Sequence, residues 1–467
     1  MLYNSGLFIF HRDLRIVDNK ALIEACNLCE NVYTVFIFTP DQVSNLNNYK
    51  SNNAVQFMIE SLVDLKHSIK EKNGNLFTFY DTQENVIQKF VKNEGIEAVF
   101  FNTDYTPYAV KRDILTRNLC KDLNIDCIEK QDYYLLEPGS IKTGDGLGDI
   151  YKKFTPFYEK VVDRKYENVS KENVKNLFNK VPNVNKKITL KKAFEKFTIK
   201  NDNLLVRGGR KNGITRLKNS ILEQSKYKQT RDYLTTKTSF LSAYIKFGCV
   251  SIREVYHAYK DKYGKYHGLI SEIFWREFFA HILYKYPNVV GKSYNKKLQS
   301  VKWRNSKSDF DRWCKGNTGF PVVDAGMRQM NETGYMHNRV RMIVADFLIK
   351  TLLLDWRLGE KYFATKLTDY DVASNNGNWQ NMSSTGVIAT PYFRSFNPFL
   401  QSEKFDKQCE YIKKWVPELN DVLPEDIHNW NTMCKNPIYK NIEYPCPIVD
   451  YAEQKKNMLQ LYKKYMK

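Results

Sequence analysis

A carboxylate, an indole and a guanidinium group follow one another closely in the segment 272–278, Glu-Ile-Phe-Trp-Arg-Glu-Phe. If this segment is helical, Glu272 and Trp275 share one face, because side chains three residues apart on a helix are neighbours. A carboxyl group beside an indole suits hydrogen bonding to the edge of a base together with stacking on its ring, and Arg276 can bind a phosphate. The alternative is a core tryptophan next to a surface ion pair.

Three tryptophans have a chemistry of their own. Trp303, Trp356 and Trp379 are separated by 53 and 23 residues. Indole is readily oxidised, so closely spaced rings can relay an electron hole from a buried site to the surface. The alternative is three core residues that only pack.

Acidic and amide side chains gather in the stretch 369–386. A buried carboxylate needs a cationic partner, and Arg341 is the candidate partner of Asp369. Asn375 offers an amide, which can donate or accept a hydrogen bond without imposing a charge. A stretch with these side chains can hold a polar ligand by hydrogen bonds.

The segment Thr238–Ser242 precedes a predicted helix that ends near Phe247 and Gly248. Hydroxyl groups and free backbone N–H groups at the start of a helix are suited to holding phosphate. The alternative is an ordinary helix cap.

The elements that must position these side chains begin with an alternation of strand and helix in residues 1–131. Predicted strands are Leu7–Phe10, Val32–Phe38, Leu76–Tyr80 and Ala98–Asn102, and predicted helices are Asn19–Cys29, Ala54–Lys70 and Val86–Asn93. This alternation predicts a parallel sheet with crossover helices, a Rossmann-like α/β domain. No G-x-G-x-x-G follows the first strand, which argues against a nicotinamide oxidoreductase.

The rest of the chain predicts a connector and a second domain. Residues 132–237 are polar, rich in Lys and interrupted by Gly and Pro, and read as a long connection with a few entry helices. From Thr238 to residue 467 helical periods dominate, which predicts an all-α domain. We expect the side chains named above to be positioned mainly by this helical domain.

Composition favours a polyanionic partner. The formal net charge is +20, which suits nucleic acid, although a proteome rich in Lys and Asn would have the same effect. Nine scattered cysteines, an odd number, and the lack of a signal peptide or a membrane-length apolar run predict a reduced, intracellular protein, cytoplasmic or nuclear. The one close pair, Cys26 and Cys29, reads as two half-buried thiols of a helix. No metal site is expected.

Three segments, in this order, resemble the photolyase/cryptochrome family. They are Phe10-His11-Arg12-Asp13-Leu14-Arg15 followed by Asp18-Asn19, then Tyr151-Lys152-Lys153-Phe154-Thr155-Pro156-Phe157, then Gly208-Gly209-Arg210 with Gly213 and Arg216-Leu217. The resemblance is densest from Glu272 to Phe405. It implies an N-terminal α/β domain and a helical domain that binds FAD.

The resemblance also implies a set of flavin contacts. These are Tyr227, Thr238, Ser239, Leu241, Ser242, Arg276, Arg341, Asp369, Asp371 and Asn375. Thr238–Ser242 matches the segment that holds the FAD pyrophosphate, although Phe240 stands where many members have Arg. Asn375 matches the residue that faces flavin N5, and Trp303, Trp356 and Trp379 match the electron-hopping chain, so these four count as the catalytic set.

For the substrate, the family's pattern points to DNA with damaged pyrimidines. Glu272, Trp275, Asn338, Arg339, Met342 and Asn381 match its lesion and DNA contacts. The pair His337-Asn338 is typical of members that repair cyclobutane pyrimidine dimers, whereas enzymes for (6-4) photoproducts usually carry two successive histidines. Asn381 departs from both branches, because dimer photolyases usually have a stacking tryptophan there.

The expected activity is light-driven repair of cyclobutane pyrimidine dimers by electron transfer from reduced FAD to a flipped-out lesion, by a monomer without membrane contact. A cryptochrome-like photoreceptor without repair and a (6-4) repair enzyme are the alternatives. The segment Asn102–Tyr108 follows a predicted strand, where open sheets bind ligands. It is the expected rim of a site for an antenna pigment: a folate, a deazaflavin or FMN.

Overall fold

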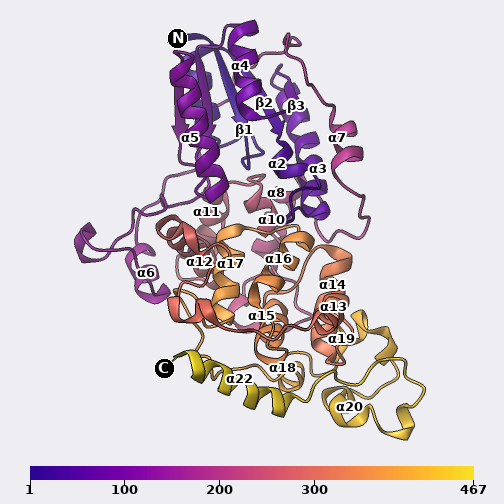
Figure 1. Ribbon diagram of the computed structural model, residues 1–467. Coiled ribbons are helices and arrows are strands. Elements are labelled where there is room, and N and C mark those ends of the chain that lie inside the picture. Colours follow the sequence, from indigo (N-terminus) through magenta and orange to yellow (C-terminus); the bar gives the residue numbers. More distant parts are fainter. Residues whose placement is uncertain (467) are drawn as a thin grey trace.

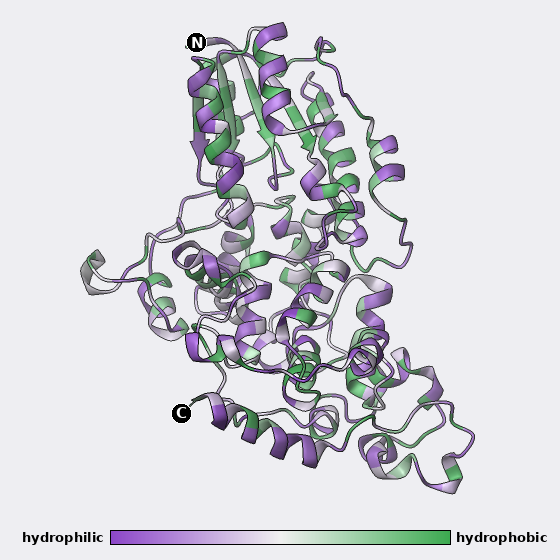
Figure 2. Cartoon of the chain, in the orientation of Figure 1, coloured by the Kyte–Doolittle hydropathy of each residue, from purple (hydrophilic) through white to green (hydrophobic). Residues whose placement is uncertain are grey.

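The computed structural model describes residues 1–466 (Figure 1). Its N-terminal region is built on five parallel strands in the order β3-β2-β1-β4-β5. The strands are β1 (Tyr3–Phe10), β2 (Cys29–Phe38), β3 (Leu76–Tyr80), β4 (Ala98–Asn102) and β5 (Asp126–Lys130). The central strands are continuous apolar runs because helices cover both faces of the sheet. Figure 2 shows these strands as mainly hydrophobic and the helices around them as mixed.

Two hydrophobic clusters define the faces of the sheet. Phe8, Phe36 and their neighbours pack against α1 (Lys20–Leu28) and α3 (Asn52–Lys70). Leu7, Val35 and the alternate positions pack against α4 (Gln83–Glu94) and α5 (Pro107–Asp122). A short helix, α2 (Pro40–Val43), follows β2. The predicted parallel α/β sheet is therefore confirmed.

Two details differ from the sequence-based expectation. β5 was not predicted, because it is a half-exposed edge strand, Asp-Cys-Ile-Glu-Lys, without a clear apolar pattern. Cys29 begins β2 instead of ending a helix, since its backbone is extended at φ −110° and ψ 147°. Both Cys26 and Cys29 are fully buried and not half-buried.

The segment 132–237 carries a few helices, as expected: α6 (Phe154–Val161), α7 (Leu190–Phe197), α8 (Arg210–Glu223) and α9 (Tyr227–Thr230). α7 runs beside the sheet region and α6 lies against the helical region (Figure 1). The predicted boundaries at residues 131 and 237 stay predictions.

The remaining described chain is helical, and no strand follows β5 within residues 1–466. The helices are α10 (Ser242–Lys246), α11 (Ile252–Tyr263), α12 (Gly268–Lys285), α13 (Lys307–Lys315), α14 (Pro321–Thr333), α15 (Asn338–Asp346), α16 (Trp356–Lys366), α17 (Val372–Met382), α18 (Pro398–Phe405), α19 (Glu410–Trp415), α20 (Pro424–His428), α21 (Trp430–Met433) and α22 (Tyr451–Met466). A π-helical turn, Phe347–Thr351, continues α15. None of the helices in residues 1–466 is long and apolar enough to cross a membrane.

A buried ionic cluster joins the two regions. Arg253 on α11 pairs with Asp18 at 2.8 Å, and Arg15 and Arg253 bind the two oxygens of Asp132. All four side chains are at most 2% exposed. The Arg-Asp-Leu-Arg motif after β1 therefore serves to dock the sheet onto the helices.

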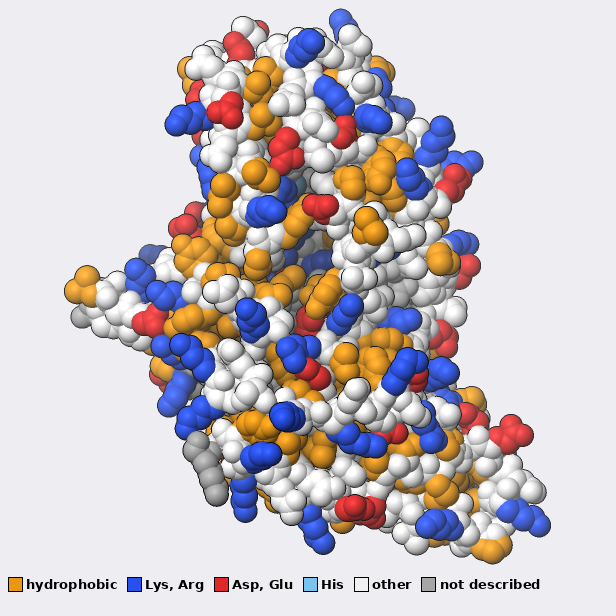
Figure 3. All heavy atoms as spheres, in the orientation of Figure 1, with side chains coloured by type: hydrophobic (Ala, Val, Ile, Leu, Met, Phe, Trp, Pro, Cys, Tyr) orange, Lys and Arg blue, Asp and Glu red, His pale blue; other side chains and the backbone are white. Residues whose placement is uncertain are grey.

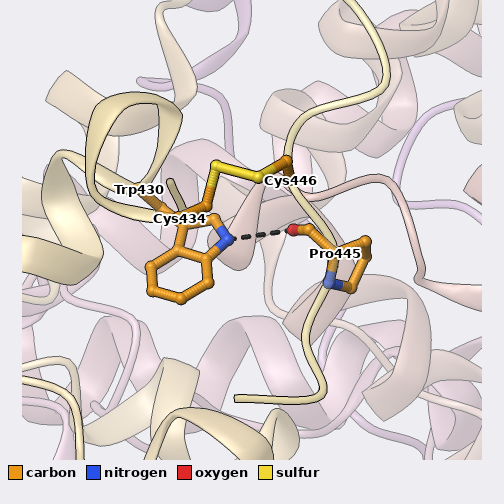
Figure 4. Close-up of a disulfide and its surroundings, with 4 residues drawn as sticks. All are labelled: Trp430, Cys434, Pro445 and Cys446. Carbon is orange, nitrogen blue, oxygen red and sulfur yellow. Dashed lines mark hydrogen bonds between the residues drawn. A yellow bond between two sulfur atoms is a disulfide. The ribbon is translucent and has the colours of Figure 1, made fainter. Parts of the chain in front are cut away.

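A disulfide links Cys434, just after α21, to Cys446 (Figure 4). The indole N–H of Trp430 donates to the carbonyl of Pro445 at 2.9 Å, which holds the same loop. A Cβ on Gly319 would collide with the Cys446 backbone, so the loop sits tightly against the start of α14. The expectation of a fully reduced protein is wrong for these two cysteines, because the fold brings together residues that no sequence pattern paired.

Candidate functional site

A cavity of about 550 Å³ opens among α10, α12, α15, α16 and α17. Its walls contain every side chain that the sequence singled out for cofactor or substrate, together with Trp379. These are Tyr227, Thr238, Ser239, Leu241, Ser242, Glu272, Trp275, Arg276, Asn338, Arg339, Arg341, Met342, Asp369, Asp371, Asn375 and Asn381. Residues up to 154 positions apart in the chain thus meet in one space because five helices converge on it.

One helix, α12, presents Glu272 and Trp275 to the cavity. Arg231 donates to Glu272 at 2.7 Å, yet burial raises the pKa of Glu272 above its ordinary value because the arginine only partly offsets it. Phe154 of α6 lies parallel to the indole of Trp275, with centroids 3.7 Å apart and planes at 6°. One face of the indole is therefore already covered by the protein.

The predicted pair of Arg341 and Asp369 is present. The Nη2 of Arg341 donates to both carboxylate oxygens of Asp369, at 3.1 and 2.9 Å. Ser242 Oγ donates to the same carboxylate at 2.6 Å. Asp369 is therefore held between α10 and α15, and the guanidinium edge beside it is fixed in place.

Asp371 caps α17 by accepting from the backbone N–H of Ser374 at 3.0 Å. Arg12, which follows β1, reaches it at 3.0 Å and also contacts Asp104 at 3.0 Å. Burial alone would raise the pKa of Asp371, but Arg12 and Arg276 outweigh it and hold the pKa below its ordinary value. Arg12 lies in the charged turn that resembles the family's first segment, but no sequence pattern pairs it with Asp371.

Asn375 is oriented by a residue that the sequence did not reveal. Its amide nitrogen donates to the carboxylate of Glu360 on α16 at 3.0 Å. Burial raises the pKa of Glu360, against hydrogen bonds from Asn375 and two tyrosines. Because the nitrogen is engaged, the carbonyl oxygen of Asn375 is the atom left to accept a hydrogen bond from a ligand.

Five basic side chains line the cavity, and four of them pair with a carboxylate: Arg231, Arg276, Arg339 and Arg341. The fifth, Lys246 at the end of α10, has no carboxylate partner within residues 1–466. Burial, reinforced by the nearby Arg12, lowers its pKa to about 7, against the attraction of Asp371 and Asp369. Among the described residues, the cavity thus holds one amine without a carboxylate partner, and at pH 7 only part of the molecules carry it protonated.

The segment Thr238–Ser242 offers backbone donors. Arg216 binds the carbonyl oxygens of Ser239 and Thr238, at 2.8 and 3.2 Å. The backbone N–H groups of Ser239, Leu241 and Ser242 have no acceptor among the described residues. Phe240 adopts a left-handed φ of +51°, so the sharp turn before α10 is built by a residue other than glycine.

The three tryptophans differ in exposure. Trp379 (3% exposed) lines the cavity, Trp356 (1%) is buried at the start of α16, and Trp303 is partly exposed beside Tyr462. Of the three, only Trp303 is partly exposed, so it is the one that could connect a relay to the surface. Another buried indole, Trp313, contacts Trp379 with centroids 6.3 Å apart, and no sequence motif pointed to it.

The expected antenna rim follows β4. Asn102 is fully buried and donates to Asp13 at 2.6 Å and to Asn19 at 2.8 Å, so it serves the sheet and not a ligand. Nearby, two buried polar atoms lack hydrogen-bond partners among the described residues: Nδ1 of His11 and Oδ2 of Asp113, whose other carboxylate oxygen pairs with Arg112 at 2.7 Å. These atoms leave hydrogen-bonding capacity at the carboxyl edge of the sheet.

Comparisons with known proteins agree with this arrangement. Residues 7–175 match the family model of DNA photolyase, and residues 269–464 match that of the FAD-binding domain of DNA photolyase. The deoxyribodipyrimidine photo-lyase of Buchnera aphidicola is 36% identical, covering 98% of each chain.

Two solved structures are similar over nearly the whole chain. The archaeal photolyase of Sulfolobus tokodaii, which contains two FAD molecules, has a TM-score of 0.86 at 38% identity, covering 98% of this chain and 100% of its own. A class III photolyase of Agrobacterium tumefaciens has a TM-score of 0.91 at 31% identity, covering 100% and 98%. The chain therefore belongs to the DNA photolyase family.

Proposed function

We propose that the protein is a light-dependent lyase that splits cyclobutane pyrimidine dimers in DNA with reduced FAD. The observation that carries the proposal is the single cavity shared by the expected flavin contacts and the expected lesion contacts. A base that leaves the duplex can reach the flavin only in such a shared space. The relatives named deoxyribodipyrimidine photo-lyase over nearly the full length support the same activity.

The side chains of the cavity fit FAD. Free N–H groups of Ser239, Leu241 and Ser242 suit the pyrophosphate, and the open carbonyl oxygen of Asn375 suits a ring N–H. Lys246, which has no carboxylate partner among the described residues, supplies a positive charge when it is protonated, and an electron-rich ring in the cavity would favour that protonated form. When bound, reduced FAD supplies the electron that light drives into the dimer.

The lesion side of the cavity binds through its polar groups. Glu272, with its raised pKa, accepts from a ring N–H when ionised and donates to a carbonyl oxygen when protonated. Asn338, which is exposed, and Met342 stand together, with the amide nitrogen 4.0 Å from the sulfur. Arg339, although paired with Asp232, adds positive charge near the DNA backbone.

We propose further that the carboxyl edge of the sheet holds an antenna pigment, a folate, a deazaflavin or a flavin. The buried atoms of His11 and Asp113 that have no partner among the described residues support a polar ligand there. The second FAD in the Sulfolobus tokodaii structure makes a flavin one of the three pigments to test. The visible spectrum of the purified protein, before and after removal of pigment, distinguishes them.

The decisive experiment is repair of defined lesions. Protein with reduced FAD, illuminated with oligo-thymidine that contains cyclobutane dimers, is expected to restore the thymine absorbance. The same assay with a (6-4) photoproduct is expected to show no repair. Absence of repair on both substrates would contradict the proposal and favour a photoreceptor without repair activity.

Two narrower points belong to the proposal. We expect a monomer, which size-exclusion chromatography with light scattering tests at the concentrations of the repair assay.

The expected intracellular location rests on cysteine usage, and the Cys434–Cys446 disulfide does not favour it.

A further inference from the structure

Asn381 is held in one orientation by a neighbouring turn. It lies near the end of α17, two residues after Trp379, and lines the cavity. Its Oδ1 accepts from the backbone N–H of Thr390 at 2.9 Å and from the Thr390 hydroxyl at 3.0 Å. A backbone N–H can only donate, so the accepting atom must be the carbonyl oxygen and the amide cannot be turned the other way.

This orientation leaves the amide nitrogen of Asn381 open. Within residues 1–466 it has no acceptor, and the side chain is partly exposed in the cavity wall. The other amides of α17 differ, because each of their nitrogens is bound to the protein. Asn375 donates to Glu360, Asn376 and Gln380 donate to the carbonyl of Val289, and Asn378 donates to the carbonyl of Ser374.

We propose that the amide nitrogen of Asn381 donates a hydrogen bond to a ring carbonyl oxygen of the damaged pyrimidine. Asn381 would then be a residue that recognises the lesion by its polar edge. This inference rests on the proposed repair function and specifies the chemistry of the group that the cavity recognises.

The chemistry of the lesion supports recognition by its edge. In a cyclobutane dimer the carbons that join the two rings are saturated, so the rings are puckered and stack poorly on a flat indole. Their carbonyl oxygens remain good acceptors. One face of Trp275 is covered by Phe154, which further limits the stacking surface in this cavity. The fixed N–H donor of Asn381, two residues after Trp379, complements these carbonyl oxygens. Glu272 offers an acceptor in the same cavity.

The test compares two kinds of DNA in the dark. Dissociation constants are measured for the flavin-containing protein with an oligonucleotide that carries one thymine dimer and with the undamaged oligonucleotide of the same sequence. N381D keeps an oxygen that accepts from Thr390 but replaces the free donor with an acceptor. We expect the preference for damaged over undamaged DNA to fall by about three- to tenfold, the worth of one neutral hydrogen bond.

N378D is the matched control. Asn378 is on the same helix, lines the same cavity and gains the same charge, but its nitrogen is bound to Ser374. We expect N378D to weaken binding of both oligonucleotides by similar factors and to leave the preference unchanged. N381L removes the donor without adding charge, so it should lower the preference as well if N381D proves unstable.

The outcomes separate this inference from the proposed function. If the wild-type protein repairs no dimer in light, the proposed function fails. If it repairs dimers while N381D or N381L retains the full preference for damaged DNA, the role of Asn381 is overturned. A loss of preference in N378D equal to that in N381D would assign the effect to charge and also overturn it.

Discussion

At the scale of single residues, the polarity that a side chain presents to the cavity is decided by a partner on another segment. Glu360 binds the nitrogen of Asn375 and leaves its oxygen open, whereas Thr390 binds the oxygen of Asn381 and leaves its nitrogen open. Two identical residues on α17 therefore have opposite roles, an acceptor and a donor. Arg12 acts similarly on Asp371, by keeping that carboxylate ionised.

Lys246 contributes to the free energy of unfolding in a way that depends on pH and can be measured. Its pKa is about 7 in the fold and 10.5 by the reference value, so the unfolded chain binds more protons between these pH values. The stability of the flavin-free protein should therefore gain from Lys246 as the pH rises from 7 toward 10.5, by at most about 1.4 kcal/mol per pH unit. Lys246→Met should be more stable than wild type at pH 7, and this advantage should shrink with rising pH.

Urea denaturation of both proteins at several pH values checks this expectation. The exposed Lys211 is the control, and Lys211→Met should follow the wild-type pH dependence. A constant difference between Lys246→Met and wild type over the whole range would refute the titration of Lys246.

The tryptophan relay is testable by a comparison of two buried indoles. Trp379→Phe should block light-driven reduction of the oxidised flavin, because it removes the oxidisable ring in the cavity wall. Trp313→Phe removes an equally buried ring, 6.3 Å from Trp379, that is outside the predicted relay, and should leave the reduction rate near wild type. The loss of visible flavin absorbance under illumination gives both rates. Wild-type reduction by Trp379→Phe would rule out this relay.

At the scale of elements, the turn after β1 couples the sheet to the flavin site. Arg12 reaches Asp371 at the start of α17, and Arg15 and Asp18 join the buried cluster with α11. The same few residues thus dock two regions and set the charge of a cavity wall. This explains in physical terms why a charged turn occurs at the end of an apolar strand.

Asp132 should be important for stability, because it neutralises two buried guanidinium groups at once. Breaking a buried pair leaves an uncompensated charge, so Asp132→Ala should destabilise the protein by about 3–5 kcal/mol. Asp202→Ala, which removes an exposed partner of Lys200, should cause no measurable change. Denaturant unfolding of the three proteins under one condition provides the test, and equal stabilities would refute the role of the cluster.

At the scale of the whole molecule, a net charge of +20 is distributed over the surface, and Figure 3 shows many Lys and Arg side chains on the drawn face. The cavity itself contributes little free positive charge, because four of its five basic groups are paired. Affinity for the DNA backbone and recognition of the lesion are therefore separate properties of the molecule.

Salt should weaken DNA binding steeply and should not change the preference for damage. The logarithm of the binding constant is expected to fall linearly with the logarithm of salt concentration, by about 0.7–0.9 per phosphate contact. Plots for damaged and undamaged oligonucleotides should be parallel. The vertical distance between them is the logarithm of the ratio of the two binding constants. Titrations at four salt concentrations check this, and converging lines would mean that lesion recognition is itself ionic.

The sequence alone determined the α/β and all-α regions, the cofactor class and about half of the residues in the cavity wall. Apolar periodicity specifies strands and helices locally, and spaced motifs such as Trp-Arg-Glu-Phe identify a family without knowledge of distances. The edge strand β5 and the start of β2 at Cys29 were missed because their local patterns are weak.

Only the tertiary structure decided which partner each polar group has. Arg12 with Asp371, Glu360 with Asn375, Thr390 with Asn381 and Cys434 with Cys446 are pairings between segments that no local pattern connects. Hydrogen-bond direction depends on such a partner, so the free donor of Asn381 is visible only in the fold. The physical reason is that a side chain carries its functional groups in the sequence, whereas the groups left over for a ligand depend on what the fold has already bound.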